Sequence, residues 1–372
     1  MKIIFCDNSI RSFVNFRIDV AEYYIQQGND VYLIYPKCTF ENGFEELLPK
    51  GCHVLQVDMN PSNMSVLQDV KTFYQLFSIY KEIKPDIIFH YTIKPNIYGT
   101  IAAKLIGVKT VSMVAGLGYM FTGNGLTKQL GRFMYKLGLR YSSWTIVLNS
   151  SNYKTLFEKG YIKSNRCSLF SGGEGVNLKR FKYVEKEYST IRFLMVARIL
   201  YDKGYTEYVE AASIVKNKYS NISFDLLGPI DETNPTGVPK HVIDKDVLDG
   251  KINYLGVTSD VASYLEKDNT VVVIPSSYNE GLNHSLMEAC AMGCPIITTD
   301  IPGCRETVED GINGYLLQSK DVQTLASKML NFIELPQKNK QEMSNASYLK
   351  AKKEFDIINV IKQYDEIINN LL

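Results

Sequence analysis

The chain has 372 residues, of which 45% are hydrophobic and 22% are charged, so it can form two ordinary domains that each bury a core. This composition excludes a mainly disordered protein. Lys and Arg (41) nearly balance Asp and Glu (40), and the net charge of +1 argues against a protein dedicated to nucleic acid. The balance hides an asymmetry. Residues 1–180 carry 21 basic and 13 acidic side chains, and residues 181–372 carry 20 and 27, which indicates two domains with different roles.

The cysteines and the N-terminal segment indicate in which cellular compartment the protein is expected. The seven cysteines are an odd number and contain no C-x-x-C pair, so we expect buried, reduced thiols in a reducing compartment. The N-terminal segment reads as a first strand and not as a signal peptide. No apolar run reaches the ~20 residues of a membrane-spanning helix. These features predict a soluble protein and leave open that it lies on a membrane surface.

Short β-rich runs alternate with helical stretches, which is typical of parallel sheets covered by helices. In the first half the expected strands are 2–6, 30–35, 53–57, 86–90, 110–113 and 145–148, and the expected helices include 14–27, 65–83 and 95–106. In the second half the expected strands are 192–196, 223–227, 253–255, 270–274, 295–298 and 314–317, and the expected helices are 203–218, 259–266, 283–292 and 321–333.

This alternation predicts two doubly wound α/β domains, over 1–180 and 188–353, with ligands at the carboxyl ends of the strands. The charged stretch 179–190 is the expected linker. Apolar residues recur at helical spacing in 356–372, so a final helix either closes the second domain or packs back on the first.

Several common enzyme motifs are missing. Gly116-Leu117-Gly118 lacks the third glycine of a dinucleotide-binding fingerprint, and the chain has neither a phosphate-binding P-loop nor a G-x-S-x-G elbow. One Asp-x-Asp, at Asp244 and Asp246, lies in a polar connection, where we expect a solvated loop and no metal site.

The segment 270–317 carries the strongest candidate site. An apolar strand ends near Pro275, a loop follows with Glu280 and Gly281, and a helix begins near Asn283. Free N–H groups at a helix start, beside a glycine, favour an anion or hydroxyl ligand. Glu280 and Glu288 stand at E-x7-E spacing, and two carboxylates there can accept paired sugar hydroxyls or simply remain solvated.

This E-x7-E element, with PSSYNEG before it and GCPIITTDIPGC after it, resembles the donor-binding half of the family 4 retaining glycosyltransferases. These enzymes have the GT-B fold, in which two Rossmann-like domains face each other across a cleft, and the resemblance covers nearly the whole chain. It implies that Arg198 and Lys203, within FLMVARILYDKGY, bind the donor diphosphate, where cations stabilise the departing phosphate. The other donor-site residues that it implies are Gly256, Glu280, Gly281, Leu282, Asn283 and Glu288.

The first half, with FHYTIKPNIYG and AGLGYMFTG, resembles the subgroup that builds bacterial capsule, O-antigen and lipid-linked oligosaccharides. The acceptor-side residues that this resemblance implies are Lys94, Gly116 and Gly118. Relatives often carry His-x-His before the lysine; here Tyr91 takes the place of the second histidine. The neighbouring His90 is either a catalytic-site residue or a packed histidine at a strand end. The first loop lacks the family's paired glycines, so Asn8, Ser9 and Ser12 are its candidate hydrogen-bond donors.

A basic stretch points to a surface role. Residues 87–157 contain eight basic residues and no acidic residue. Within it Lys128, Arg132, Lys136 and Arg140 recur every four residues on an expected helix that also carries Leu130, Phe133, Met134, Leu137 and Tyr141. This is the pattern of a helix that lies in a membrane interface, or of a solvated face over a packed core.

The resemblance implies a hexosyltransferase (EC 2.4.1-type) that needs no metal or other cofactor. Its donor is a nucleoside-diphosphate sugar, UDP-linked, and its acceptor is a polyprenyl-diphosphate-linked or oligosaccharide precursor of a surface polysaccharide. We expect a cytoplasmic protein, peripheral on the inner face of the bacterial plasma membrane, that transfers a hexose or N-acetylhexosamine with retention. Two alternatives remain open: a non-hydrolysing UDP-sugar epimerase, and a non-catalytic, lectin-like member of a polysaccharide assembly complex.

Overall fold

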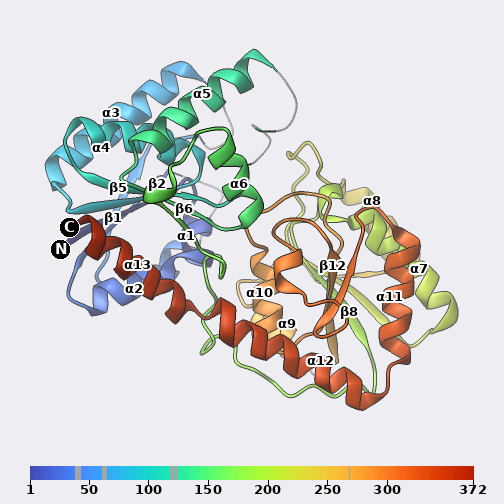
Figure 1. The fold of residues 1–372 in the computed structure, drawn as a ribbon. Helices are drawn as coiled ribbons and strands as arrows, with labels where there is room; N and C mark the ends of the chain where they lie inside the picture. Colours follow the sequence, from blue (N-terminus) through green and yellow to red (C-terminus); the bar gives the residue numbers. More distant parts are fainter. Residues whose placement is uncertain (38–42, 61–64, 118–120, 122–124, 268) are drawn as a thin grey trace. The chain divides into compact units, whose positions relative to one another are not determined.

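The computed structural model describes residues 1–372 except 38–42, 61–64, 118–120, 122–124 and 268 (Figure 1). The chain forms two compact units: Met1–Gly175 with Ile357–Leu372, and Val176–Asp356. Each unit is one parallel sheet with helices on its faces, so the expected pair of doubly wound α/β units is confirmed. In the described part of the chain, no helix is both long and apolar enough to cross a bilayer.

The sheet of the first unit has the strand order β3-β2-β1-β4-β5-β6-β7. Its strands are β1 (Lys2–Cys6), β2 (Asp30–Pro36), β3 (His53–Val57), β4 (Ile87–Tyr91), β5 (Lys109–Val114), β6 (Trp144–Val147) and β7 (Cys167–Leu169). The helices are α1 (Ile10–Phe16), α2 (Ile18–Gln26), α3 (Val66–Ile83), α4 (Thr100–Leu105), α5 (Leu126–Tyr141), α6 (Ser150–Glu158) and α13 (Ile357–Leu371). The central strands are buried on both faces, which is why they read as continuous apolar runs.

Two expectations for this unit were wrong in detail. The helix expected over 14–27 is broken between α1 and α2 at Arg17, whose φ of −130° and ψ of −5° are not helical. The side chain of Arg17 is drawn into buried ion pairs, and those contacts decide the break. The helix expected over 95–106 begins with a π-helical turn, Pro95–Gly99, before α4.

The sheet of the second unit has the strand order β10-β9-β8-β11-β12-β13. Its strands are β8 (Arg192–Val196), β9 (Ser223–Leu227), β10 (Asn253–Tyr254), β11 (Thr270–Ile274), β12 (Ile296–Thr299) and β13 (Gly314–Leu317). The helices are α7 (Tyr205–Lys218), α8 (Lys240–Leu248), α9 (Ala262–Leu265), α10 (His284–Ala291), α11 (Val322–Glu334) and α12 (Gln337–Lys350).

The Asp-x-Asp expected in a solvated loop lies instead on helix α8, so that expectation was wrong. Asp246 is buried and accepts hydrogen bonds from the hydroxyl of Tyr205 (2.8 Å) and from Lys251 (2.8 Å). Asp244 pairs with Lys240, four residues earlier. Burial of one carboxylate is possible because two donors satisfy it.

The stretch 179–190, expected as a linker, packs on the second unit from Val176 onward. The reason is Lys186, whose side chain is 1% exposed. Its ammonium donates to the carbonyl of Leu265 (2.6 Å) and to two further carbonyls at the end of α9. A cation stabilises the free carbonyls at a helix C-terminus, and this offsets the cost of burying it.

Helix α13 packs on the first unit, against α2 and the sheet. The hydroxyls of Tyr23 and Tyr24 donate to Asp365 at 2.9 and 2.8 Å. Its buried side chains join the core that contains Phe89 and Phe170; they are Ile357, Val360, Tyr364, Ile367 and Ile368.

Candidate functional site

Each sheet has one place where the strand order reverses, between β1 and β4 in the first unit and between β8 and β11 in the second. In doubly wound sheets the ligand binds at the carboxyl ends of the strands at this switch point. Arg198 and Lys203 follow β8, and Glu280 follows β11. Three of the expected donor-site residues therefore lie after the two strands at which the fold itself predicts a ligand.

Lys203 and Glu280 form an ion pair, with 2.5 Å between Lys203 Nζ and Glu280 Oε1. Both side chains are largely buried, at 13% and 17% exposure. The two loops are joined because Ser277 N donates to the carbonyl of Asp202 (2.8 Å). Gly204, with a φ of +87°, allows this approach, since a Cβ there would lie 2.3 Å from the carbonyl oxygen of Pro275.

The carboxylate of Glu280 is further held by the start of helix α10. The side-chain amide of Asn283 donates to Glu280 Oε1 (3.1 Å), and its oxygen caps the helix by accepting from Leu286 N (3.2 Å). Gly303, with a φ of +93°, lies directly behind, because a Cβ there would be 2.8 Å from Glu280 Cβ. Gly281 and Leu282 are buried between these residues. The structure thus brings together Lys203, Glu280 and the first turn of α10.

Glu288 lies further along α10 and pairs with His284, one turn earlier. His284 Nδ1 is 3.1 Å from Glu288 Oε1, and both side chains are about nine-tenths buried, at 14% and 13% exposure. Sequence reasoning did not select His284, although its spacing of four residues from Glu288 was a usable signal. An imidazole beside this carboxylate offers a second hydrogen-bonding group to any ligand that binds Glu288.

Arg198 and Gly256 lie apart from these contacts. Arg198 is half exposed and its Nη1 is 3.5 Å from Asp231 Oδ2, so the guanidinium is accessible to a ligand. Gly256 has a φ of +81°, and an added Cβ would meet no atom within 4 Å. Its carbonyl accepts from Gly228 N (2.9 Å), which fixes the loop after β10 to the loop after β9.

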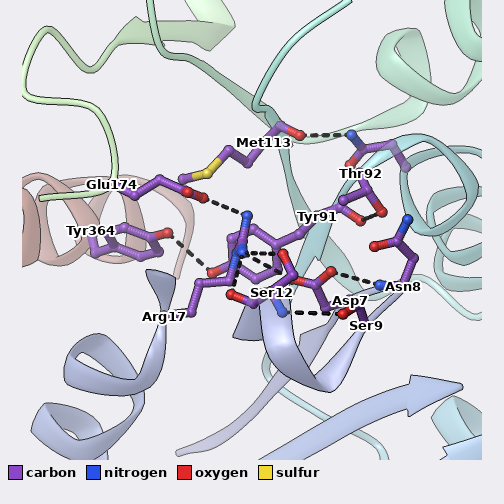
Figure 2. Close-up of polar contacts among 11 residues, drawn as sticks. Asp7, Asn8, Ser9, Ser12, Arg17, Tyr91, Thr92, Met113, Glu174 and Tyr364 are labelled. Carbon is purple, nitrogen blue, oxygen red and sulfur yellow. Dashed lines mark hydrogen bonds and ion pairs between the residues drawn. The ribbon is translucent and has the colours of Figure 1, made fainter. Parts of the chain in front are cut away.

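At the switch point of the first unit, a buried cluster surrounds Arg17 (Figure 2). The guanidinium pairs with Asp7 (3.0 Å) and with Glu174, and lies 4.1 Å from the ring centroid of Tyr91. The hydroxyl of Tyr91 is 3.1 Å from that of Tyr364 on α13. Tyr91 therefore fills the place of the family's usual histidine as a fully buried core residue.

The first loop offers fewer free donors than expected. Ser9 caps α1 by accepting from Ser12 N (3.1 Å), and Ser12 Oγ accepts from Arg17 (2.9 Å). Asn8 alone of the three has no side-chain hydrogen bond to another described residue. The register that pairs Cys6 with His90 places Asn8 and Thr92 at equivalent positions beyond β1 and β4.

Thr92 has a left-handed backbone, with a φ of +66°. This conformation is unfavourable for a β-branched residue, and such strain is concentrated at functional sites. The hydroxyl of Thr92 donates to the carbonyl of Tyr91 (2.5 Å). The π-helical turn that follows is a rare conformation, and such turns are frequent at functional sites. Asn8 and Thr92 thus lie at the edge of this sheet where the fold predicts a ligand, and Thr92 is strained there.

His90 is fully buried. Its Nε2 lies 3.0 Å from the hydroxyl of Tyr80, and its Nδ1 lies 3.2 Å from the hydroxyl of Thr100. A Cβ on Gly99 would lie 2.4 Å from Nε2, so the ring has no room for a ligand beside it. Burial lowers the pKa of His90 to about 3, which keeps the imidazole neutral. These contacts favour packing, the second of the two roles expected for this histidine.

Of the remaining acceptor-side candidates, Lys94 and Gly116 also lie at this edge. Lys94 Nζ is 2.5 Å from Asp69 Oδ1, and the hydroxyl of Tyr98 donates to the other oxygen of Asp69 (2.8 Å). Gly116 follows β5. Gly118 lies outside the described residues.

Helix α5 carries Lys128, Arg132, Lys136 and Arg140 beside an exposed apolar face. Leu126, Leu130 and Phe133 are 85%, 60% and 62% exposed, although the pattern alone allowed Leu130 and Phe133 to be core residues. At about 100° per residue the cations cover an arc of about 120° that adjoins this apolar face.

Two family models match the chain. "Glycosyl transferase 4-like" matches residues 2–150, and "Glycosyl transferases group 1" matches residues 178–350. Each matched segment corresponds to one of the two sheets. Both halves of the chain therefore match glycosyltransferase models, and the fold is that of the GT-B glycosyltransferases.

Similar proteins agree with this assignment. A Campylobacter jejuni protein, N,N'-diacetylbacillosaminyl-diphospho-undecaprenol alpha-1,3-N-acetylgalactosaminyltransferase, is 27% identical over the full length of both chains. The Escherichia coli UDP-Gal:alpha-D-GlcNAc-diphosphoundecaprenol alpha-1,3-galactosyltransferase is 24% identical, covering 72% of this chain and 71% of the relative. Among solved structures, that of Anabaena HepE in complex with UDP aligns with this chain over the full length of both, with a TM-score of 0.79 and 20% identity.

Proposed function

We propose that this glycosyltransferase moves a hexose or N-acetylhexosamine, with retention, from a UDP-sugar to a polyprenyl-diphosphate-linked precursor of a surface polysaccharide. The observation that carries the proposal is the Lys203–Glu280 pair at the start of α10, at the switch point of the second sheet. The names of the two relatives, which act on diphosphoundecaprenol-linked sugars, support the acceptor class. The UDP bound to the Anabaena protein supports the nucleotide.

The roles of the residues follow from their charge and position. Arg198 and Lys203 stabilise the departing diphosphate, because positive groups placed where negative charge develops lower the barrier. The N–H groups at the start of α10 add hydrogen bonds to the same phosphate. Glu280 binds hydroxyls of the transferred sugar, and Glu288 binds those of the ribose.

In the reaction, the bond between the anomeric carbon and the phosphate oxygen breaks, and a bond to the acceptor oxygen forms on the same face. The proton of the acceptor hydroxyl passes to the leaving phosphate oxygen, so no protein nucleophile takes part. The ion pair between Lys203 and Glu280 opens when the donor binds. The diphosphate then replaces Glu280 as the partner of the ammonium, and the sugar hydroxyls replace Lys203 as partners of the carboxylate.

We also propose that helix α5 binds the cytoplasmic surface of an anionic bilayer. The exposed apolar side chains of Leu126, Leu130 and Phe133 insert at the boundary of the headgroups, and the adjoining cations meet the anionic lipids. A lipid-linked acceptor lies in that membrane, so this contact brings the enzyme to its substrate.

The test measures UDP release from a panel of UDP-sugars, with and without a polyprenyl-diphosphate-linked acceptor. We expect one sugar to give acceptor-dependent release and a glycosylated lipid, and we expect this activity to persist in EDTA. Interconversion of UDP-sugars without acceptor would indicate an epimerase instead. Binding of sugars with no turnover of any donor would indicate a non-catalytic protein.

A further inference from the structure

A pocket of about 390 Å³ lies in the first unit, away from the candidate acceptor edge. It is lined by Leu139, Arg140, Ser142, Thr145, Gly160, Tyr161, Ile162, Lys163 and Arg166. Ser142 and Thr145 flank the start of β6, and Arg166 directly precedes β7. The pocket therefore opens at the amino ends of these strands, whereas Asn8 and Thr92 follow the carboxyl ends of theirs. Its volume is at the small end of the range for ligand pockets, about 300–1,000 Å³.

The pocket has an excess of positive charge. Residues 126–166 contain eight basic residues and a single acidic residue, Glu158, which lies 4.0 Å from Lys154. Arg140, Lys163 and Arg166 form no ion pair with any acidic residue in the described part of the chain. The C-terminal ends of α5 and α6 lie nearby, but each helix end supplies only about half a negative charge. The positive charge of the side chains that line the pocket is therefore larger than the partial negative charge of the two helix ends.

Two cations also converge at the rim. A Cβ on Gly160 would lie 3.6 Å from Lys136 Nζ and 3.9 Å from Arg140 Nη2. Like charges four residues apart on a helix repel each other. Lys136 is partly satisfied by the carbonyl of Lys159 (2.7 Å) and by the ring of Tyr161. An anion at this point relieves the repulsion and provides Arg140 with a partner.

We propose that this pocket binds the phosphoglycerol headgroup of an anionic phospholipid. The charge excess selects an anion, and Lys163 and Arg166, which line the pocket and are exposed, can contact the phosphate. The exposed apolar face of α5, whose nearest member Phe133 lies two helical turns before Arg140, provides a surface for the acyl chains. The inference rests on the proposed membrane association and adds to it a discrete lipid site.

The single tryptophan of the chain reports on this site. Trp144 lies between Ser142 and Thr145 in the sequence, and its indole N–H donates to Ser168 Oγ (2.9 Å). The probe is dihexanoyl phosphatidylglycerol, used as a monomer below its micelle concentration. We expect a saturable change in tryptophan emission with one lipid per protein. Dihexanoyl phosphatidylcholine and inorganic phosphate should give no saturable change at the same concentrations.

Two charge-matched variants complete the test. The double variant Lys163→Gln with Arg166→Gln should weaken binding by roughly thirty-fold, at about fivefold for each cation. The control, Lys104→Gln with Lys109→Gln, removes two exposed cations of the same unit away from the pocket and should bind as wild type does. Equal losses in the two variants, or no saturable response in the wild type, would overturn the proposal. Equal binding of inorganic phosphate would make this a free-phosphate site and also overturn it.

The same samples separate this proposal from the proposed function. Calorimetry with UDP should give equal affinity in the wild type and in the Lys163→Gln, Arg166→Gln variant, because the pocket and the donor site belong to different units. Loss of lipid binding with intact UDP binding is the expected pattern. If the protein binds no nucleotide but still binds the lipid, only the glycosyltransferase proposal fails.

Discussion

At the scale of single residues, the donor phosphate contacts carry the most direct prediction. Arg198→Ala and Lys203→Ala should each lower kcat/KM by about 100-fold, which corresponds to roughly 3 kcal/mol of transition-state stabilisation. Arg198→Ala should change the thermal midpoint little, because the Arg198 side chain is half exposed. Lys203→Ala should lower the midpoint, because it leaves the largely buried carboxylate of Glu280 without its cation. Steady-state kinetics with a UDP-sugar measure the effect. Turnover at the wild-type rate in either variant would refute the assignment to the diphosphate.

The two glutamates should fail in different ways. Glu288→Gln should weaken UDP itself, because this residue is assigned to the ribose, whereas Glu280→Gln should spare UDP and depress transfer. Calorimetry with UDP alone, followed by transfer assays, distinguishes the two. Because His284 pairs with Glu288, His284→Ala should also weaken the binding of UDP, but by less than Glu288→Gln does. Equal losses of UDP affinity at Glu280 and Glu288 would mean that the ligand is oriented differently along α10.

His90 links burial to the pH dependence of stability. A histidine in the unfolded chain has a pKa of about 6.5, and that of buried His90 is about 3. Below about pH 6.5 the unfolded state therefore binds a proton that the folded state does not. The contribution of His90 to stability is complete above that pH and falls as the pH approaches 3, by up to about 1.4 kcal/mol per pH unit.

Urea unfolding followed by Trp144 emission, at several values between about pH 7 and pH 5, measures this slope in the first unit. His90→Asn should lower stability at neutral pH and flatten the slope. The matched control is His53→Asn, which makes the same substitution at an exposed position of the same unit. If the His90 variant and the wild type have the same slope, the imidazole of His90 takes up its proton in the folded state as well, and the explanation by burial is wrong.

At the scale of elements, helix α5 makes the membrane proposal measurable. Four cations near an anionic surface contribute about 1 kcal/mol each, or roughly a thousandfold in partitioning. Replacing Lys128, Arg132, Lys136 and Arg140 by Gln should abolish binding to anionic vesicles at low salt. The double variant Leu130→Ser with Phe133→Ser should weaken binding at high salt as well, because it removes the apolar part. If the quadruple variant co-sediments with the vesicles as the wild type does, the cationic face of α5 is only a solvated surface and does not bind the membrane.

Most elements could be predicted from the sequence, because the central strands are buried on both faces and read as apolar runs. The break at Arg17 could not be predicted, since it depends on ion pairs with Asp7 and with Glu174, and Glu174 is 157 residues away in the sequence. Helix α8 was missed because its exposed polar residues resemble those of a loop. For the site, E-x7-E spacing indicated Glu280, but its pairing with Lys203 depends on the neighbouring positions of β8 and β11.

At the scale of the whole molecule, helix α13 should be necessary for the first unit to fold. It buries five large side chains in that core, at about 1.5–3 kcal/mol each, and the sum is comparable to the 5–15 kcal/mol that stabilises a typical domain. A chain that ends after Asp356 should lose the native emission of Trp144 while the second unit still unfolds cooperatively. The substitution Ile358→Ser, at an exposed position of the same helix, should change stability by less than about 0.5 kcal/mol.

The discontinuous first unit also has a consequence for biosynthesis. A ribosome releases residues 1–175 long before it makes the helix that completes their core, because the second unit, 176–356, is translated in between. At about 5–20 residues per second, the nascent first unit waits roughly 10–35 s with an apolar groove exposed. The second unit can fold during this interval, since all its segments are contiguous. The first unit is therefore completed only after the second has been translated, and until then the core surface that α13 covers is the part of the first unit that a chaperone would have to protect.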